Sequence, residues 1–462
     1  MEAVTLAIAL VGVVLVLRLS PLRGLLVYLG ILCWYSDWQP IVIGGVNFTA
    51  PRIVIIALLV QCLGDARLRV RFRWSVADTF VVLLFAGELV AGIATSPLDK
   101  LLQNRSGALF DTGLVYFVVR LVAGSRAEYS TILKGLLVIA APLAVLGAFQ
   151  SVTGSNPWGA LVNRGAVFVG ATAVTDRALE MRRYGFFRAS VNFPYSITFG
   201  FFFALVGAAG AGLWRSIARR ERGLVAAGLA LALVGTVSSM SSGPIMAGAT
   251  SLMVLCLWPL RRHWKIGFGG IVVALAVIDI ISNRHWYDVL AWYLTFNRDT
   301  AQYRIDLIEE ALTGGMAGHW IVGYGLFDPA SIHEVLTHWK HTDIANHYIY
   351  QVMRFGLIGL VPWVGFVVLV VRNLRRGYGT ARSAADRWMG WCLGAGIAGV
   401  LSSMFSACWE GQPYNVFFGI LGAAASMPAM VANGRPADVP VPVRAGVGTV
   451  RQVGRVVPSG QA

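Results

Sequence analysis

The chain has 462 residues, of which 56% are apolar, 13% are charged and 52 are glycines. An ordinary soluble domain carries about 25% charged residues, so this composition excludes disordered, collagen-like and coiled-coil chains and argues against a soluble enzyme. The formal charge of +15, from 38 Lys and Arg against 23 Asp and Glu, would indicate a nucleic-acid partner in a soluble protein, but in a membrane protein it can instead report which side the basic loops face.

Apolar runs long enough to cross a bilayer follow one another along the chain. They predict about thirteen spans, near residues 3–17, 21–36, 50–64, 76–95, 107–122, 132–152, 195–214, 224–240, 244–259, 266–282, 346–371, 388–405 and 414–431. The first two runs are short and could form a hairpin that does not fully cross. The sequence therefore predicts an all-α, polytopic integral membrane protein with about 12–13 transmembrane helices.

The N-terminus and the cysteines add little chemistry. The first apolar run has no basic residue before it and no small-residue cleavage site after it, so we interpret it as a retained span rather than a signal peptide. Five cysteines are scattered singly through apolar segments without C-x-x-C spacing. They are predicted to be small buried side chains rather than disulfide partners or zinc ligands.

Basic residues are distributed unevenly between the two sides of the predicted spans. Alternate loops and the C-terminal tail hold 25 basic and 5 acidic residues, whereas the other side and the spans hold 13 and 18. Basic loops stay in the cytoplasm. This pattern therefore predicts that the basic loops lie on the inner side, next to anionic membrane lipids, and that the N-terminus lies outside. The charge thus reports orientation, and no nucleic-acid partner is expected.

This topology divides the chain into membrane segments and loops. They are N-terminal transmembrane helices (1–152), a first outer loop (153–194), central transmembrane helices (195–282), a large outer loop (283–345), C-terminal transmembrane helices (346–431) and a disordered cytoplasmic tail (432–462). Both outer loops are long and rich in Trp, Tyr, Arg and His, so we expect the functional residues there.

Arginines cluster in the first outer loop, against the overall charge trend. Arg182, Arg183 and Arg188 are among four arginines within twelve positions. Guanidinium groups suit phosphate or pyrophosphate binding, which makes these three candidate anion ligands, with Arg188 the foremost because it directly precedes a span. The alternative is interfacial snorkelling with pairing to Asp176 and Glu180.

The large outer loop contains one predicted helix. Asp299 and Gln302 have the spacing of a capping box, an apolar stripe follows, and a Gly-Gly pair ends the helix. Arg304 lies on this helix as a candidate anion ligand. The alternative is a surface ion pair of Arg304 with Asp306 or Glu310.

Histidines are frequent near the end of this loop. His333, His338 and His341 are spaced by five and three residues without a suitable carboxylate, so no metal ion is predicted. His347 begins the next span, where a neutral imidazole could act as a general base, with Asn346 beside it as a candidate substrate contact. The alternative is a solvated or hydrogen-bonded helix cap.

Three stretches together resemble the superfamily of O-antigen ligases and polysaccharide polymerases, which are membrane glycosyltransferases. They are Arg188-Ala189 leading through Phe193-Pro194 into a span, Arg304 within Thr300–Leu312 followed by His319–Gly325, and Asn346–Ile349 followed by Arg354–Gly359. The segment Ser241–Pro244 is also similar to that family's corresponding segment. The resemblance extends from about residue 20 to residue 430 and depends on the order and loop placement of the motifs.

The resemblance implies a GT-C-like enzyme of the bacterial inner membrane whose large periplasmic loop contains short helices. Members transfer a glycan from undecaprenyl pyrophosphate to a sugar hydroxyl at the periplasmic face, without a metal ion or other cofactor. It implies that Arg188 and Arg304 hold the pyrophosphate and that His347 is the base. The ligase order would place the histidine at Ala345, so the order Ala345-Asn346-His347 is more similar to the polymerases.

Such a transfer needs an acceptor hydroxyl that loses its proton and a leaving pyrophosphate whose charge is neutralised. We therefore expect Arg188 and Arg304 to converge, and a single attack to invert the anomeric carbon. Candidate sugar-stacking residues are Tyr303, Trp320, Tyr324 and Trp339. Expected partners are the undecaprenyl-pyrophosphate-linked glycan, a glycan or lipid A core acceptor, membrane lipids and polysaccharide assembly proteins.

Two other functions remain open. One is an O-antigen ligase that joins polymer to the lipid A core. The other is a transporter of polysaccharide or lipid-linked glycan, which would be expected to show broken helices in two halves and ionisable residues at mid-membrane depth. The candidates for the latter, Glu88, Asp279 and Glu410, are few and unpaired in the sequence, so an enzyme is favoured.

Overall fold

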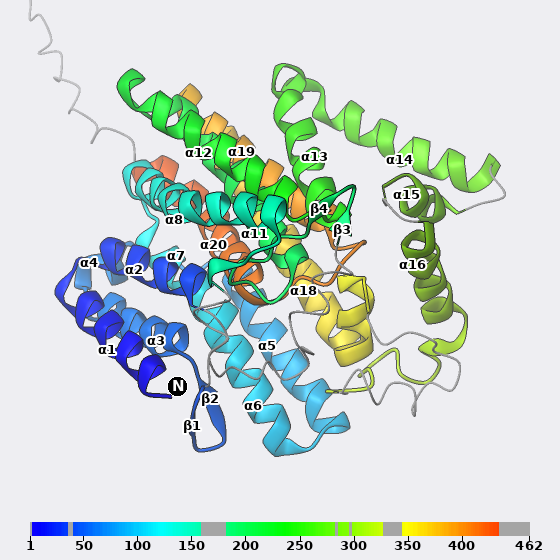
Figure 1. Ribbon diagram of the computed structural model, residues 1–462, viewed down its shortest axis with the longest axis horizontal. Coiled ribbons are helices and arrows are strands. Elements are labelled where there is room, and N and C mark those ends of the chain that lie inside the picture. Colours follow the sequence, from blue (N-terminus) through cyan, green and yellow to red (C-terminus); the bar gives the residue numbers. More distant parts are fainter. Residues whose placement is uncertain are drawn as a thin grey trace, which may run out of the picture.

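The computed structural model describes residues 2–35, 40–158, 182–281, 285–294, 298–326 and 344–433. This part of the chain is mostly helical (Figure 1). Its α-helices are α1 (Glu2–Arg18), α2 (Pro21–Trp34), α3 (Ala50–Gly64), α4 (Ala66–Arg71), α5 (Val76–Thr95), α6 (Leu98–Ala108), α7 (Leu114–Val122), α8 (Arg126–Thr153), α11 (Ser196–Gly210), α12 (Arg222–Ser238), α13 (Ser242–Cys256), α14 (Trp264–Ile281), α15 (Trp286–Leu294), α16 (Arg298–Glu310), α18 (His347–Thr380), α19 (Ala384–Ser403) and α20 (Gly411–Asn433).

Shorter elements connect these helices. There are π-helical segments at Leu109–Gly113 and Ala311–Gly315, and 3₁₀ turns at Ala211–Arg215, Arg219–Glu221 and Trp258–His263. The strands of the described residues form two antiparallel hairpins, β1 (Ile41–Ile43) with β2 (Val46–Phe48) and β3 (Arg182–Arg183) with β4 (Phe186–Phe187). The predicted helical fold class is thus confirmed, with two small hairpins added.

Helices occur at the position of every predicted span. Those long and apolar enough to cross a membrane, within the described residues, are Val76–Thr95, Arg126–Thr153, Ser196–Arg215, Arg219–Ser238, His347–Thr380 and Gly411–Asn433. Shorter apolar helices are Pro21–Trp34, Ala50–Gly64, Ser242–Cys256 and Val272–Ile281. The six long apolar helices support a membrane protein.

Local sequence explains several helix ends. At the start of α8 the Ser125 side chain accepts a hydrogen bond from the backbone N–H of Glu128, and at the start of α19 Ser383 does the same for Asp386. Such caps satisfy N–H groups that have no partner inside the helix. The end of α8 is marked by Gly154, whose φ of 75° is left-handed.

The centre of the molecule is formed by α11 and α20 (Figure 1). Four of the phenylalanines of α11, Phe199, Phe201, Phe202 and Phe203, are fully buried. Phe201 stacks on Trp409 with ring centres 4.3 Å apart. This packing fixes the chain just before α20, where the functional side chains described below begin.

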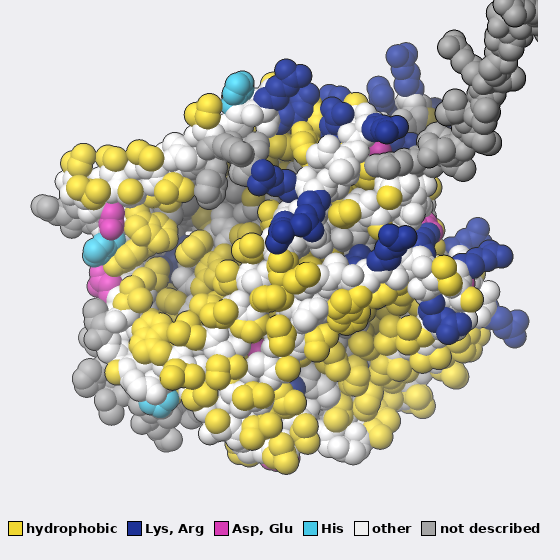
Figure 2. Space-filling view, turned by 180° about the vertical axis from the view of Figure 1, so that it is seen from behind, with side chains coloured by type: hydrophobic (Ala, Val, Ile, Leu, Met, Phe, Trp, Pro, Cys, Tyr) yellow, Lys and Arg dark blue, Asp and Glu magenta, His cyan; other side chains and the backbone are white. Residues whose placement is uncertain are grey.

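The loops predicted to lie on the inner face come together in the structure. Arg71 pairs with Glu128 at 2.9 Å, and Arg126 pairs with Asp386 at 3.2 Å. Figure 2 shows Lys and Arg gathered over one side of the molecule, next to a broad apolar surface. The charge asymmetry counted from the sequence therefore corresponds to an asymmetry in space.

The two predicted outer loops are described in part. In the first, the β3–β4 hairpin carries Arg182 and Arg183; in the second, α16 confirms the predicted helix around Arg304. Outside the described residues lie the candidate residues His333, His338, His341 and Trp339, the side chain of Asp299 and the predicted tail from residue 434 onward.

Candidate functional site

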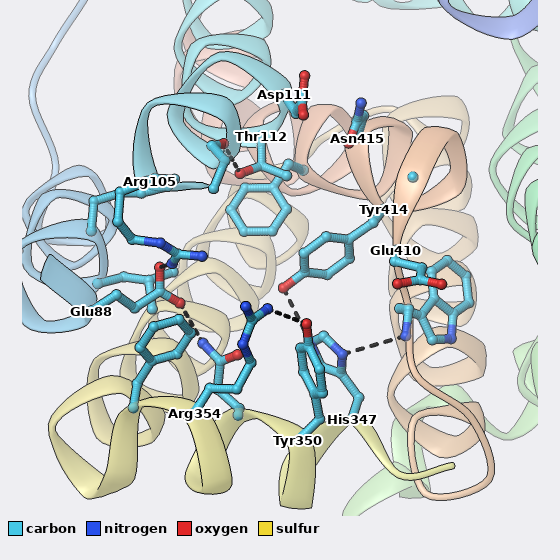
Figure 3. A pocket seen from close by; sticks show the side chains of 18 residues that line it. Glu88, Arg105, Asp111, Thr112, His347, Tyr350, Arg354, Glu410, Tyr414 and Asn415 are labelled. Carbon is cyan, nitrogen blue, oxygen red and sulfur yellow. Dashed lines mark hydrogen bonds and ion pairs between the residues drawn. The ribbon is translucent and has the colours of Figure 1, made fainter. Parts of the chain in front are cut away.

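A polar cavity of about 180 Å³ opens among the ends of four helices. Parts of α5, α6 and the π-helical segment Leu109–Gly113 line it together with α18 and the start of α20 (Figure 3). Its polar lining residues are Glu88, Arg105, Asp111, Thr112, His347, Tyr350, Gln351, Arg354, Glu410, Tyr414 and Asn415. By the predicted topology this is the outer end of the helices, and π-helical turns are frequent at functional sites.

Arg105 is held in the cavity by a carboxylate. Its Nη1 forms an ion pair with Oε2 of Glu88, and its Nε donates to Oδ1 of Asn104 at 3.1 Å. The other oxygen of Glu88 accepts a hydrogen bond from Nε2 of Gln351 on α18. The buried carboxylate is therefore neutralised, and the contact ties α5 to α18.

Arg354 has a different environment. Its Nη1 donates to the hydroxyl of Tyr350, while its Nε is buried and has no hydrogen-bond partner among the described residues. The ring of Phe355 contacts both cations, with Cζ of Arg105 4.4 Å and Cζ of Arg354 5.7 Å from its centre. Burial lowers the pKa of Arg105; the Glu88 carboxylate opposes this shift, and the positive charge of Arg354 adds to it. Two cations thus share one cavity, and Arg354 has donors left for an anion.

A break in α18 positions Arg354. At Gly356 the backbone has φ 61° and ψ −160°, so the helix stops and restarts there. The segment Trp320–Gly325 fills the break through backbone hydrogen bonds of 2.6 to 3.2 Å to both halves of α18. A Cβ on Gly356 would lie 2.1 Å from the carbonyl oxygen of Ile321, so both the positive φ and this contact require glycine. Two of the stretches that carry the family resemblance therefore form one structural unit.

His347 is buried at the start of α18. Its Nε2 lies 3.2 Å from the hydroxyl of Tyr414, which accepts a hydrogen bond from Nε1 of Trp363 at 3.0 Å. Its Nδ1 accepts from the backbone N–H of Trp409 at 3.3 Å. An accepting Nδ1 carries no proton, so the proton of the neutral ring is on Nε2 and points at Tyr414. Both nitrogens are engaged within the protein, which places the predicted base poorly for taking a proton from a substrate.

Two carboxylates besides Glu88 line the cavity. Asp111 accepts two hydrogen bonds from Arg52, at 2.9 and 2.6 Å, and is neutralised by this bidentate pair. Glu410 lies just before α20 and is exposed, on the side of the cavity that holds Tyr414 (Figure 3). An exposed carboxylate at this place can accept a proton from a bound hydroxyl. The cavity thus offers a guanidinium for an anion and a base for an alcohol.

Metal chemistry finds no support in the described ranges, where no three His, Cys, Asp or Glu side chains are grouped to hold an ion. No protein-family model and no curated protein matches the chain. Function is therefore inferred from the geometry of this cavity.

Arg188 and Arg183 form a second cationic cluster. Nη2 of Arg188 donates to Oγ of Ser241 at 2.9 Å, and Nη1 of Arg183 donates to the carbonyl of Met240 at 3.3 Å. Burial lowers the pKa of Arg188 to about 10, and the positive charge of Arg183 adds to the shift. The cluster lies at the turn before α13. The predicted anion-binding role of these arginines thus stays a prediction, with Ser241 as a new neighbour.

Arg188 and Arg304 do not line the cavity that contains His347, and their convergence stays a prediction. The cavity that contains His347 is lined by Arg105 and Arg354 in place of the two predicted arginines. The physical reason is the packing of α16. Its apolar residues, with those that follow, form a buried cluster with residues of α18. Arg304 itself is buried on α16.

The remaining candidates have structural contacts, and none lines the cavity. Asn346 caps α18, because its Oδ1 accepts from the backbone N–H groups of Tyr348 and Ile349 at 3.0 and 3.2 Å. The Tyr324 hydroxyl donates to a backbone carbonyl. Trp320 lines an apolar groove on another side of α18.

Two more candidates lie on the outer segments. The Arg182 guanidinium is 4.4 Å from the ring centre of Phe187, a cation–π contact within the β3–β4 hairpin. Tyr303 lies beside Arg304 on α16. Neither is placed in the cavity, so their substrate-binding roles stay predictions.

The ion pair between Glu88 and Arg105 inside the cavity was not predicted from the sequence. Glu88 was expected to be unpaired, but it pairs with Arg105, 17 residues further on. A signal was present, because an acidic residue within one span and a basic residue just before the next can lie at similar depth when the spans are antiparallel. Arg354 stood in a motif that resembles the family, yet only the break at Gly356 shows that it faces the cavity.

Proposed function

We propose that the protein is a membrane glycosyltransferase that transfers or polymerises glycan repeat units from undecaprenyl pyrophosphate at the periplasmic face of a bacterial inner membrane. The observation that carries this proposal is Arg354, a cavity-lining guanidinium with a buried, unused donor beside a second arginine. Leaving such a group unsatisfied is costly, and a pyrophosphate would supply the missing acceptors. The resemblance to polysaccharide polymerases supports the same donor.

The proposed reaction divides its tasks between two sides of the cavity. Arg354 and Arg105 stabilise the negative charge that develops on the pyrophosphate as its bond to C1 of the donor sugar breaks. Glu410 takes the proton of the acceptor hydroxyl, whose oxygen forms the new bond to C1 from the opposite side. The electron pair of the broken bond leaves with the pyrophosphate, and the anomeric centre is inverted. His347 acts as a positioning residue that holds Tyr414.

Polymerase and ligase activities differ in the acceptor. A polymerase joins the growing glycan to another repeat unit, whereas a ligase joins it to the lipid A core. The order Ala345-Asn346-His347 is similar to the polymerases, and we therefore place polymerase first.

A transporter is the second candidate, and two observations favour it. The helix α18 is broken at Gly356, and Glu88 and Arg105 form an ion pair at a wall of the cavity. Broken helices and paired ionisable residues are common at substrate sites of transporters. The same cavity would then bind an anionic lipid-linked glycan without transferring it.

The glycans of a strain that lacks the protein distinguish these functions. Products with a single repeat unit on the lipid A core indicate a lost polymerase, and lipid-linked polymer that never reaches the core indicates a lost ligase. Repeat units that accumulate on the inner face indicate a lost transporter, and an unchanged glycan profile contradicts all three. Wild type should restore the glycan profile of this strain, and so should the control Arg219→Ala, which changes an exposed residue of the inner face. Arg354→Ala should fail to restore it at equal protein level.

A further inference from the structure

An open polar groove of about 420 Å³ lies close to the cavity. It is lined by Asn47, Arg52, Lys100, Gln103, Asn104 and Leu326. These residues come from the β1–β2 hairpin and its neighbouring helices α3 and α6, which lie side by side in Figure 1, and from the end of the segment that fills the break in α18. No part of the function proposed above uses this groove.

A smaller cavity of about 100 Å³ lies next to both the groove and the site. It shares Asp111 and Asn415 with the cavity that holds Arg354, and it shares Arg52 with the groove. The ion pair of Arg52 and Asp111 stands where the three spaces meet. The groove therefore adjoins, through the smaller cavity, the cavity that holds Arg354.

The groove contains hydrogen-bonding groups that are unused within the described residues. Arg52 is fully engaged by Asp111 and the carbonyl of Asn47, and Asn104 accepts from Arg105. By contrast, the side chains of Asn47, Lys100 and Gln103 have no hydrogen bond or ion pair with the described part of the chain. Three polar side chains thus face one open space with their donors and acceptors available.

We propose that this groove binds the glycan chain of a substrate while Arg354 binds the pyrophosphate, an inference that rests on the proposed function. Each amide of Asn47 and Gln103 donates and accepts at once, which matches the paired hydroxyls of a sugar. Lys100 adds an ammonium group that has no carboxylate partner among the described residues, so the groove favours a glycan with an acidic sugar at that position. A glycan in the groove would lie beside the cavity in which the reacting carbon is bound.

The glycan could belong to the donor or to the acceptor, and steady-state kinetics distinguish the two. The assay uses membranes with the full chain, lipid-linked repeat units from a strain lacking the protein as donor, and the oligosaccharide released from the polymer of the parent strain as acceptor. The variant is Asn47→Ala/Gln103→Ala. The matched control is Val42→Ala, an exposed residue of the same hairpin outside the groove.

We expect the double variant to raise one KM by about 10-fold, through the loss of several hydrogen bonds, while kcat stays within about twofold. A rise for the oligosaccharide assigns the groove to the acceptor, and a rise for the lipid-linked repeat unit assigns it to the donor. If both KM values equal those of wild type and of the control, the groove does not bind glycan, although glycosyl transfer stands.

If wild type itself transfers no glycan, the proposed function fails and binding must be measured directly. Saturation-transfer NMR of the same oligosaccharide on the purified full chain then decides. Signal on wild type and on Val42→Ala that is lost with the double variant keeps the groove as a glycan site. Equal signal, or equal absence of signal, on all three proteins overturns it.

Discussion

Two arginines at opposite ends of the molecule, Arg120 buried and Arg354 half-buried, have the same side chain and different surroundings. At the predicted inner end, Arg120 of α7 donates from Nε and Nη2 to Asp78 at 3.0 and 2.8 Å, and its other donors reach a backbone carbonyl and a serine hydroxyl. At the predicted outer end, Arg354 reaches the Tyr350 hydroxyl, and its buried Nε is unsatisfied within the described residues.

The difference separates a structural arginine from one prepared for a ligand. The buried Nε of Arg188 is unsatisfied within the described residues as well, but Arg354 lines the cavity and Arg188 does not. Buried donors in folded proteins are nearly all satisfied, so the exceptions need a physical reason. The protein itself completes the bonds of Arg120. For Arg354 the missing acceptors would come from the pyrophosphate, and the following variants test that contrast.

Removing Arg354 is expected to have the largest effect on activity. Arg354→Ala should lower the rate of glycan transfer by about 10³-fold, because the charge that develops on the pyrophosphate loses its main counter-charge. Arg354→Lys should lower it by about 10-fold to 100-fold, since it keeps the charge and loses the planar fork. Rates per amount of protein in isolated membranes provide the measurement. If Arg354→Ala and Arg354→Lys were both as active as wild type, Arg354 would not be a ligand-binding arginine, and its contrast with Arg120 would be wrong.

Removing Arg120 should destabilise the folded protein rather than act directly on the transfer reaction. Arg120→Ala leaves the Asp78 carboxylate buried without its partner, which costs about 3–5 kcal/mol. We expect a large loss of folded protein by size-exclusion chromatography, and partial recovery in Arg120→Met/Asp78→Leu, which removes both charges. Arg354→Ala should elute as wild type does. A stable, fully folded Arg120→Ala would contradict the structural role.

The base is tested by comparing Glu410 with His347. Glu410→Gln should lower kcat by about 10²-fold, because a neutral amide cannot take the acceptor's proton. His347→Gln should have a smaller effect, since the ring only holds Tyr414 and the Trp409 backbone. If the order were reversed, with His347→Gln inactive and Glu410→Gln active, the base would be the histidine implied by the resemblance.

The smallest effect is expected at the second cationic cluster. Arg188→Ala should change the rate of transfer by less than about 10-fold, because Arg188 does not line the cavity. Loss of its hydrogen bond to Ser241 is a local change. Should Arg188→Ala abolish transfer at a normal protein level, the pyrophosphate site would include Arg188, as the resemblance implies.

The helical architecture could be predicted from the sequence because apolar length and charge asymmetry are properties of single segments. Helices formed at all thirteen predicted spans, and the helix around Arg304 was predicted from its capping pattern and glycines. The candidate site could be predicted less well, because it depends on contacts between segments. The pairing of Glu88 with Arg105 joins two helices, and no periodicity in either helix encodes it.

The break at Gly356 illustrates the same limit. A glycine inside an apolar run is common in spans, and the sequence does not show that a distant segment inserts its backbone there. Because the backbone of Trp320–Gly325 inserts at this break, Arg354 lies near the end of a helical segment. Its side chain there lines the cavity. His347 was predicted at the correct helix start, but its two engaged nitrogens follow from Tyr414 and Trp409.

Binding of undecaprenyl pyrophosphate to the purified full-length chain in nanodiscs, measured by native mass spectrometry, tests the central claim most directly. We expect wild type and Arg219→Ala to bind this lipid more tightly than undecaprenyl monophosphate, and Arg354→Ala to lose that preference while remaining folded. Equal binding of the pyrophosphate lipid by wild type and Arg354→Ala would contradict the assignment of this arginine to the pyrophosphate.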